Sequence, residues 1–179
     1  MHAPRKGKAQ PIRAPEARAL RRAAEPPADP GAALMERPGV LVRRLHQVHS
    51  AMFQEETAGF GVTPVQFSLM TLLTERPGLE QGAAAAGLRL DRFTTADVVR
   101  RLEAAGLLRT RPGQDRRAKA LFLTRKGAQV FASMGEAVSR AHDRLVEPLP
   151  PARRGTFLRM LRQLVDQHGA VGAPSPKVR

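Results

Sequence analysis

Apolar residues recur every three or four positions over residues 38–58, which predicts a long amphipathic helix. Pro38 suits the first turn of this helix, and Gly59 follows its expected end. Its apolar positions are Leu41, Leu45, Val48 and Met52. A second helix should follow closely, because Thr63 and Gln66 have the spacing of a capping box in front of another apolar run.

Residues 79–105 have the pattern of a helix-turn-helix. A short alanine-rich helix over residues 79–87 leads through a tight turn to a second helix, for which Asp91 is the expected N-cap. The side of the second helix that should be buried consists of Thr95, Val98, Val99 and Leu102. The exposed side, which DNA would meet, carries Arg92, Thr94, Asp97, Arg100 and Arg101.

The hydrophobic period changes from helical to alternating after Gly106, which predicts two short strands over residues 107–111 and 119–124. The segment between them is Pro112-Gly113-Gln114-Asp115-Arg116-Arg117. Its proline, glycine and arginines predict a hairpin with a basic tip, so residues 107–124 should form a small β-wing.

Two further helices are expected over residues 126–147 and 152–168. The first carries a seam, an apolar stripe with steps of three and four residues, which is typical of a helix that packs on a partner. Its residues are Phe131, Met134, Val138, Ala141 and Leu145. Together with the helix over 38–58, these helices have more apolar surface than one small domain can bury, which suggests a homodimer interface. We therefore predict a mainly α fold with a small β-wing, a winged helix-turn-helix that dimerises through its N- and C-terminal helices.

A chain of 179 residues can form one domain with tails, and we place that domain at residues 37–169. Residues 1–36 form a basic arm rich in Ala, Pro and Arg, and this arm and residues 170–179 should be disordered. The formal charge of +14 points to a polyanionic partner, either nucleic acid or an acidic membrane surface. Without a transmembrane stretch or a signal peptide, we expect no membrane partner and a cytoplasmic, nucleoid-associated location.

The composition also narrows the chemistry. Cysteine is absent, which excludes disulfides, thiolate metal sites and sensing by thiol oxidation. Trp and Tyr are absent as well, so base stacking would rest on seven Phe, which favours duplex over single-stranded DNA. We find no catalytic motif and no metal-ligand spacing, and therefore expect neither an enzyme nor a cofactor. A basic architectural DNA-binding protein without ligand control remains the alternative.

Two linked motifs resemble the MarR family of bacterial regulators. The wing motif consists of Asp115-Arg116-Arg117 and, after five intervening residues, Leu123-Thr124-Arg125-Lys126-Gly127. The run from Val99 to Arg109 resembles the end of that family's recognition helix and the entry to its wing. The order of predicted elements agrees over residues 38–168. The resemblance implies a homodimer whose recognition helices enter successive major grooves of a pseudo-palindromic site, while the wings reach the flanking minor grooves.

The resemblance also assigns roles to single residues. Arg117 would lie in the minor groove, oriented by an ion pair with Asp115, and Arg92 and Thr94 would face bases. The candidate DNA-contacting residues are Arg92, Thr94, Thr95, Arg109, Arg111, Asp115, Arg116, Arg117 and Lys119. Phe93 departs from the family, which has a small polar residue there; it either packs against the preceding helix or touches a thymine methyl group.

MarR-like regulators commonly bind a small aromatic acid in a crevice beside the first two helices. The lining residues here would be Arg43, Arg44, His46, His49, Phe53, Phe67 and Met70. An arginine can hold both carboxylate oxygens while Phe or Met contacts the ring. Arg43 and His49 have the spacing found in some relatives that sense phenolic acids, and the segment from Arg37 resembles regulators of aromatic-acid breakdown, including nicotinate catabolism. A structural or interface role for the two histidines is the alternative. We expect a repressor that such an acid releases from its operator.

Overall fold

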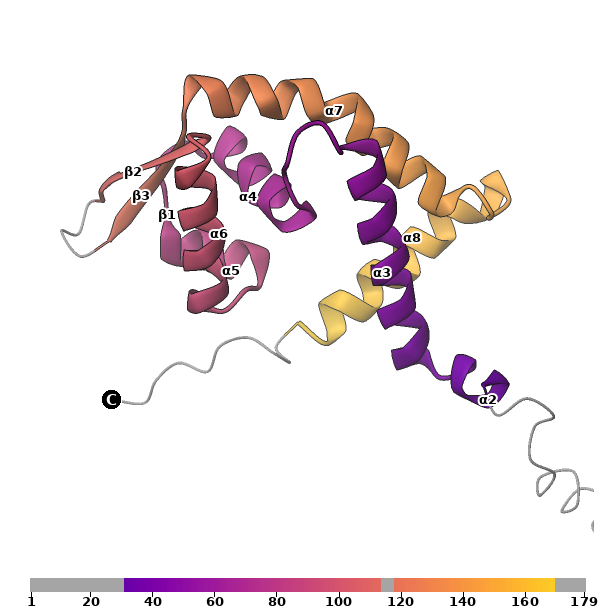
Figure 1. Cartoon of the computed structure of the whole chain (residues 1–179). Coiled ribbons are helices and arrows are strands. Elements are labelled where there is room, and N and C mark those ends of the chain that lie inside the picture. The colour runs from indigo at the N-terminus through magenta and orange to yellow at the C-terminus, as the bar shows by residue number, and fades with distance from the viewer. Residues whose placement is uncertain (1–30, 114–117, 170–179) are drawn as a thin grey trace, which may run out of the picture. The chain divides into compact units, whose positions relative to one another are not determined.

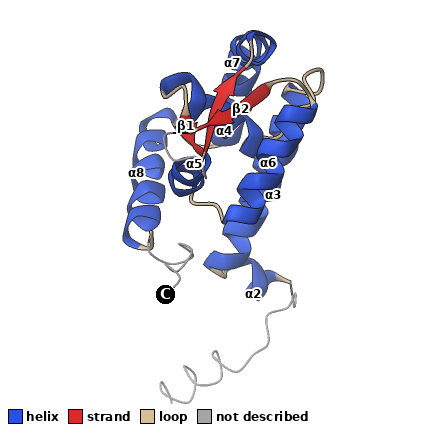
Figure 2. Ribbon diagram, turned by 90° about the vertical axis from the view of Figure 1, so that its left-hand side faces the viewer, coloured by secondary structure: helices blue, strands red, loops and turns tan. Residues whose placement is uncertain are grey.

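The computed structural model describes residues 31–113 and 118–169. The chain divides into two compact units, Met1–Leu45 and His46–Arg179. The helices are α2 (Ala32–Met35), α3 (Pro38–Glu56), α4 (Pro64–Glu75), α5 (Gln81–Leu88), α6 (Arg92–Ala104), α7 (Arg125–Val146) and α8 (Pro151–Gln167) (Figure 1). The strands are β1 (Leu79–Glu80), β2 (Leu108–Pro112) and β3 (Lys119–Leu123) (Figure 2). Over these residues no helix has the length and hydrophobicity that a membrane span requires.

Local sequence signals set the helix ends. The Thr63 N–H donates to Gln66 Oε1 at 2.8 Å and the Gln66 N–H to Thr63 Oγ1 at 3.4 Å, which confirms the predicted capping box of α4. Asp91 caps α6, because its Oδ1 accepts from the Thr94 N–H at 2.8 Å. The predicted helix-turn-helix is thereby confirmed as α5 and α6. The arm needs one correction: α2 lies at its end, whereas residues 1–30 lie outside the described residues.

The sheet has three strands, one more than the sequence predicted. Its order is β1-β3-β2 and both pairings are antiparallel. Leu79 and Glu80 form β1, so the prediction that the helix starts at Leu79 was wrong. Gly78 adopts a positive φ of 83°, and its N–H donates to the Leu121 carbonyl oxygen at 2.9 Å. This turn directs Leu79 alongside β3, and the helix begins two residues later.

The core of the larger unit joins α4, α6, α7 and the sheet. Its wholly buried side chains include Leu69, Leu73, Leu102, Leu121 and Met134. The seam of α7 packs into this core, since Met134, Val138 and Ala141 are buried there. For these three residues the partner of the seam is thus α4 and β3 of the same chain, whereas Leu145 at the far end of the seam is only half-buried.

Helix α8 differs from α7, because none of its residues is buried. Its exposed large apolar side chains are Leu158, Met160, Leu164 and Val165. Their exposed fractions lie between 45% and 61%, which is unusual for four such residues on one helix. The sequence predicted more apolar helix surface than one domain can bury, and α8 carries such surface.

Candidate DNA interface and effector site

The first turn of α6 presents its side chains to solvent. Arg92, Phe93 and Thr94 are all exposed, and Phe93 is 90% exposed. The alternative that Phe93 packs against the preceding helix is therefore wrong. The Asp91 carboxylate receives hydrogen bonds from the Thr94 side chain and backbone, which lower its pKa and fix the first turn.

Thr95 does not belong to this exposed set. Its side chain has no accessible surface, although the residue borders a hollow of about 400 Å³ between α5, α6 and β3. The Thr95 hydroxyl donates to the Asp91 carbonyl oxygen at 2.8 Å, so it is occupied inside the helix. The prediction that Thr95 contacts DNA is corrected on this ground, since the helix turns this position toward the core.

Further along α6, one carboxylate is shared by two arginines. Asp97 forms ion pairs with Arg100 and with Arg101, whose Nε lies 2.7 Å from Asp97 Oδ2. The hydrogen bond from Arg100 is the main cause that lowers the pKa of Asp97. Among the residues that the structure describes, the Arg92 side chain has no such partner. Arg92, at the N-terminal end of α6, is therefore an exposed guanidinium that is available for a contact with DNA.

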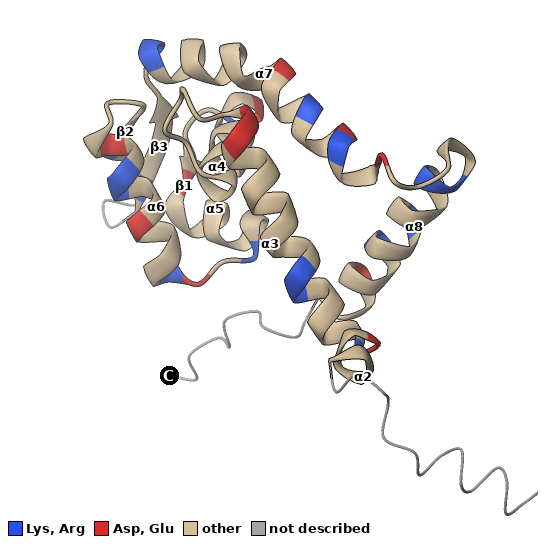
Figure 3. Cartoon of the chain, turned by 45° about the vertical axis from the view of Figure 1, so that its right-hand side comes forward, with Lys and Arg blue, Asp and Glu red and all other residues tan. Residues whose placement is uncertain are grey.

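The wing holds two arginines on one face. Arg109 and Arg111 lie over the ring of Phe122, with guanidinium carbons 5.8 and 5.7 Å from its centroid. Both arginines and Lys119 are exposed, and basic residues also occur on α6 and along α8 (Figure 3). The ring limits the motion of both guanidinium groups while leaving them open to solvent. The predicted tip residues Asp115, Arg116 and Arg117 lie outside the described residues.

The wing and the recognition helix α6 are tied together by side chains. Glu103 Oε1 accepts from the Thr110 N–H at 3.1 Å and from its hydroxyl at 2.8 Å. The Thr124 hydroxyl donates to the Gly106 carbonyl oxygen at 2.7 Å, and Lys126 Nζ to that of Ala105 at 2.9 Å. These bonds join the end of α6, β2 and the start of α7, so helix and wing form one rigid unit.

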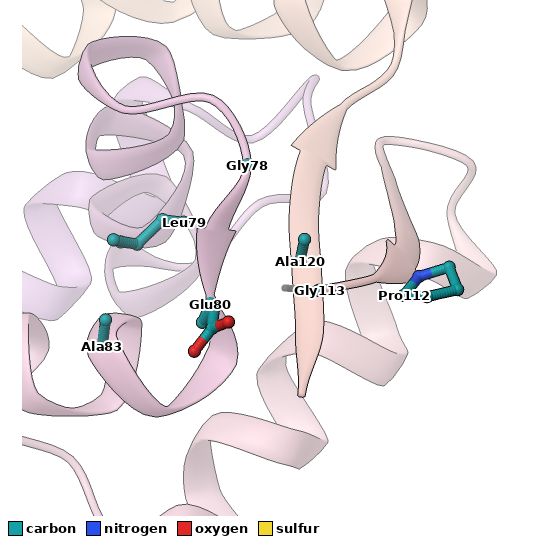
Figure 4. Close-up of a pocket in the computed structure, with 7 residues that line it drawn as sticks. All are labelled: Gly78, Leu79, Glu80, Ala83, Pro112, Gly113 and Ala120. Atoms are coloured by element: carbon teal, nitrogen blue, oxygen red, sulfur yellow. The ribbon is translucent and has the colours of Figure 1, made fainter. Parts of the chain in front are cut away.

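An open hollow of about 530 Å³ lies where β1 meets the wing. Figure 4 shows its lining, with the Glu80 carboxylate at the end of β1. Small or apolar residues make up the rest: Gly78, Leu79, Ala83, Pro112, Gly113 and Ala120. Neither this hollow nor the one beside Thr95 involves a residue predicted to bind the effector.

Three of the predicted effector residues of the larger unit belong to an aromatic cluster. His49, Phe53 and Phe67 follow one another at ring-centroid distances of 6.3 and 6.1 Å. Phe67 stacks on Phe131 of α7 at 5.0 Å, and His49 stacks on His142 at 5.6 Å. We call these five residues the aromatic cluster; it joins the second half of α3 to α4 and α7.

The burial of the predicted effector residues differs. Phe53 and Met70 are buried in the core, whereas His49 and Phe67 are half-buried. The side chains of Arg43, Arg44 and His46 are exposed. Sequence reasoning missed Phe131 as a cluster member and missed His142 altogether. Phe131 was assigned to the α7 seam, and His142 directly follows the seam residue Ala141, which is the signal that could have found it.

The environment of His49 disfavours the imidazolium. Burial lowers the pKa of His49 below its ordinary value of 6.5, and the nearby charges of His142 and His46 lower it further. His49 is thus poised as a neutral base in the free protein. Further along α3, Glu56 pairs with Arg140 and Arg144, and Glu55 pairs with Arg144. The hydrogen bonds from Arg140 and Arg144 lower the pKa of Glu56.

Comparison with known proteins places this architecture. Residues 60–118 match the MarR family model. A putative transcriptional regulatory protein for the hcr operon of Thauera aromatica is 35% identical over 60% of this chain and 65% of its own length. The transcriptional repressor CouR, bound to a 23-mer DNA duplex, superposes with a TM-score of 0.69 at 32% identity, over 74% of this chain and 94% of its own.

A third relative carries ligand information. BpsR of Bordetella bronchiseptica, whose DNA binding is regulated by 6-hydroxynicotinic acid, superposes with a TM-score of 0.69 at 26% identity, over 74% of this chain and 96% of its own. Sequence identity and a matching winged helix-turn-helix thus coincide over nearly the whole length of these solved regulators. The chain belongs to the MarR family and is a transcription regulator, not an enzyme.

Proposed function

We propose that this chain is a homodimeric repressor that binds a pseudo-palindromic operator and is released from it by a small aromatic carboxylate. The observation that carries the proposal is the rigid unit of α6 and wing, which presents Arg92, Thr94, Arg109 and Arg111 to solvent. A preformed unit loses little conformational freedom when it docks on duplex DNA. Arg92 and Thr94 would read bases, and the wing arginines and Lys119 would contact phosphates.

The proposed dimer explains the apolar surface of α8. In the single chain, α8 exposes four large apolar side chains: Leu158, Met160, Leu164 and Val165. The α8 helix of a second copy carries the same apolar side chains and would bury these four. Two recognition helices held at a fixed separation would then meet two half-sites about one DNA turn apart. The proposed location is the cytoplasm, at the nucleoid, where the operator lies.

The proposed effector site is the aromatic cluster. An aromatic ring would join His49, Phe67 and Phe131 by the same edge and face contacts that these rings make with one another. The carboxylate would pair with Arg43 or Arg44, a role that rests on the family resemblance and on the chemistry of arginine. The regulation of BpsR by 6-hydroxynicotinic acid supports an acid of this class. Because the cluster joins α3, α4 and α7, an added ring there would shift the separation of the recognition helices.

A fluorescence-anisotropy titration tests the proposal. We expect the full chain to bind its own promoter at least about a thousandfold more tightly than a scrambled duplex, and one acid from an aromatic panel to abolish this preference. Equal, steeply salt-dependent binding to both duplexes without an acid effect would instead establish the architectural alternative.

Two variants separate the DNA face from the effector site in this titration. Arg117→Ala should weaken promoter binding by about 1 to 3 kcal/mol without changing the dimer, because a minor-groove guanidinium is lost. Arg43→Ala should bind the promoter normally but no longer respond to the acid. A variant Arg43→Ala that still responds would remove this arginine from the site, and an unchanged Arg117→Ala would remove the wing tip from the mechanism.

Effector binding should also depend on pH. In the free protein the pKa of His49 lies below 6.5, and the negative charge of the bound acid would raise that pKa. Binding then takes up a proton, so the affinity for the acid should increase as the pH falls toward 6. Calorimetry in two buffers of different ionisation enthalpy measures the uptake. His49→Gln should abolish it; proton release by the wild type would contradict the placement of the carboxylate.

A further inference from the structure

We propose that Phe93 determines operator specificity by contacting the 5-methyl group of a thymine in the major groove. The inference rests on the proposed function and adds a base contact to it. Phe93 is the second residue of α6, the recognition helix, and residues at the N-terminal end of such a helix reach base edges.

The exposure of Phe93 is the first argument. At 90% it is the most exposed large apolar side chain in the part of the chain that the structure describes; the others lie between 45% and 61%. The ring contacts no other aromatic side chain and no guanidinium among those residues. Water therefore surrounds nearly the whole phenyl group in the free protein, and covering it in a complex would be favourable.

The residues around Phe93 indicate that duplex DNA is the partner that buries its ring. Arg92 and Thr94, its neighbours in the sequence, are exposed as well, and the Arg92 guanidinium has no ion-pair partner among the described residues. Arg100 and Arg101 are instead paired with Asp97 further along the helix. The exposed basic side chains Arg109, Arg111 and Lys119 lie on the wing that side-chain hydrogen bonds join to this helix. A protein partner for an apolar ring would not require this charge, whereas a DNA groove does.

The first turn also holds the ring in place. The Thr94 N–H is bound to Asp91 at 2.8 Å, and the Thr95 hydroxyl to the Asp91 carbonyl oxygen at 2.8 Å. The backbone on which Phe93 stands is thereby fixed before DNA arrives, so little ordering is needed on binding.

The chemistry of a phenyl ring selects the base. Phenylalanine neither donates nor accepts a hydrogen bond, so it cannot distinguish the polar edges of the other bases. Thymine alone presents a methyl group in the major groove. A phenyl group at this position therefore favours thymine.

The inference is tested by selecting binding sites from a DNA library and then removing single thymine methyl groups from the selected site. The full-length wild type and Phe93→Ala each select sites from a random duplex library. The recovered wild-type site is then synthesised with deoxyuridine replacing each thymine in turn, which removes only the methyl group. Phe93→Ala is expected to fold like the wild type because the side chain is exposed.

We expect one thymine of each half-site to matter. Its replacement by deoxyuridine should weaken wild-type binding about fourfold, and roughly fifteenfold when both half-sites are changed. Phe93→Ala should select sites without this thymine and bind both duplexes equally. Arg92→Ala, the control, should bind more weakly but retain the full difference between thymine and deoxyuridine.

The outcomes separate the two proposals. A wild type that selects no sequence overturns the proposed function and this inference with it. A wild type that selects a site but is indifferent to every methyl group, or a Phe93→Ala chain with the same methyl dependence, overturns the inference alone. If the ring instead inserted between base pairs as a wedge, the wild type would be indifferent to the methyl groups. Phe93→Ala would then lose affinity equally on thymine and deoxyuridine duplexes.

Discussion

Gly127→Ala should destabilise the chain by about 3 kcal/mol or more and lower its melting temperature by roughly 10 °C. Gly127 is buried in the first turn of α7, and an added Cβ would overlap the Leu107 carbonyl oxygen. That oxygen cannot move aside, because it accepts the Thr124 N–H at 3.0 Å. The Gly127 N–H is itself bound to Thr124 Oγ1 at 2.9 Å, which keeps the helix from shifting. Urea and thermal unfolding followed by circular dichroism measure the loss.

Gly135→Ala is the matched control in the same helix. A Cβ at Gly135 would have no neighbour within 4 Å, and alanine is the better helix former by up to about 1 kcal/mol. This variant should therefore be as stable as the wild type or more so. Equal destabilisation by both substitutions would show that backbone flexibility, and not the contact with Leu107, explains the need for glycine at position 127.

The position of Gly127 also has a functional consequence. The same junction carries the bonds from Thr124 to Gly106 and from Lys126 to Ala105, which join α7 to the end of the recognition helix. The wing motif that suggested the family therefore contains two kinds of residue. Its arginines would contact DNA, whereas Thr124 and Gly127 build the joint that holds helix and wing together.

Most helices of this fold could be predicted from the sequence because their determinants are local. The capping box of Thr63 and Gln66 and the cap of Asp91 act within four residues, and the apolar period of α6 identified its buried side correctly. The two wing strands were likewise visible as an alternating pattern between turn residues.

Features that depend on distant partners were not predictable in this way. Leu79 and Glu80 form a strand only because β3, some forty residues later, lies beside them. The α7 seam looks like an interhelical seam whichever chain supplies the other helix, and only the packing of α4 decides the question. Thr95 is a different case: the apolar period of α6 placed it correctly on the buried side, and only its additional assignment to DNA was wrong.

The candidate effector site was predicted in part for the same reason. Phe53 and Phe67 were named because they lie on the first two helices, but their neighbours Phe131 and His142 come from α7. Which residues of α7 meet α3 and α4 depends on the angle at which α7 crosses them. The sequence pattern of α7 alone does not predict that crossing angle.

Phe53→Ala should cost about 3 to 5 kcal/mol of stability, whereas Phe93→Ala should change it by less than about 0.5 kcal/mol. The two side chains are chemically identical and both lie on helices, but Phe53 is 2% exposed and Phe93 90%. Removing the Phe53 ring leaves a cavity beside Phe67 and removes its centroid contact with His49 at 6.3 Å. Equilibrium unfolding in urea, with the wild type as reference, gives both values from the change in midpoint at constant m-value.

For operator binding we expect the opposite ranking of the two variants. Phe93→Ala leaves the fold intact and should weaken operator binding, because the proposed methyl contact is lost. Phe53→Ala, assayed well below its melting temperature, should still bind the operator but respond less to the aromatic acid, since the second half of α3 is attached less firmly to α4. If Phe53→Ala remained as stable as the wild type, the ring at position 53 would not be a core contact, and the aromatic cluster could not transmit a ligand's presence from α3 to the DNA-binding unit.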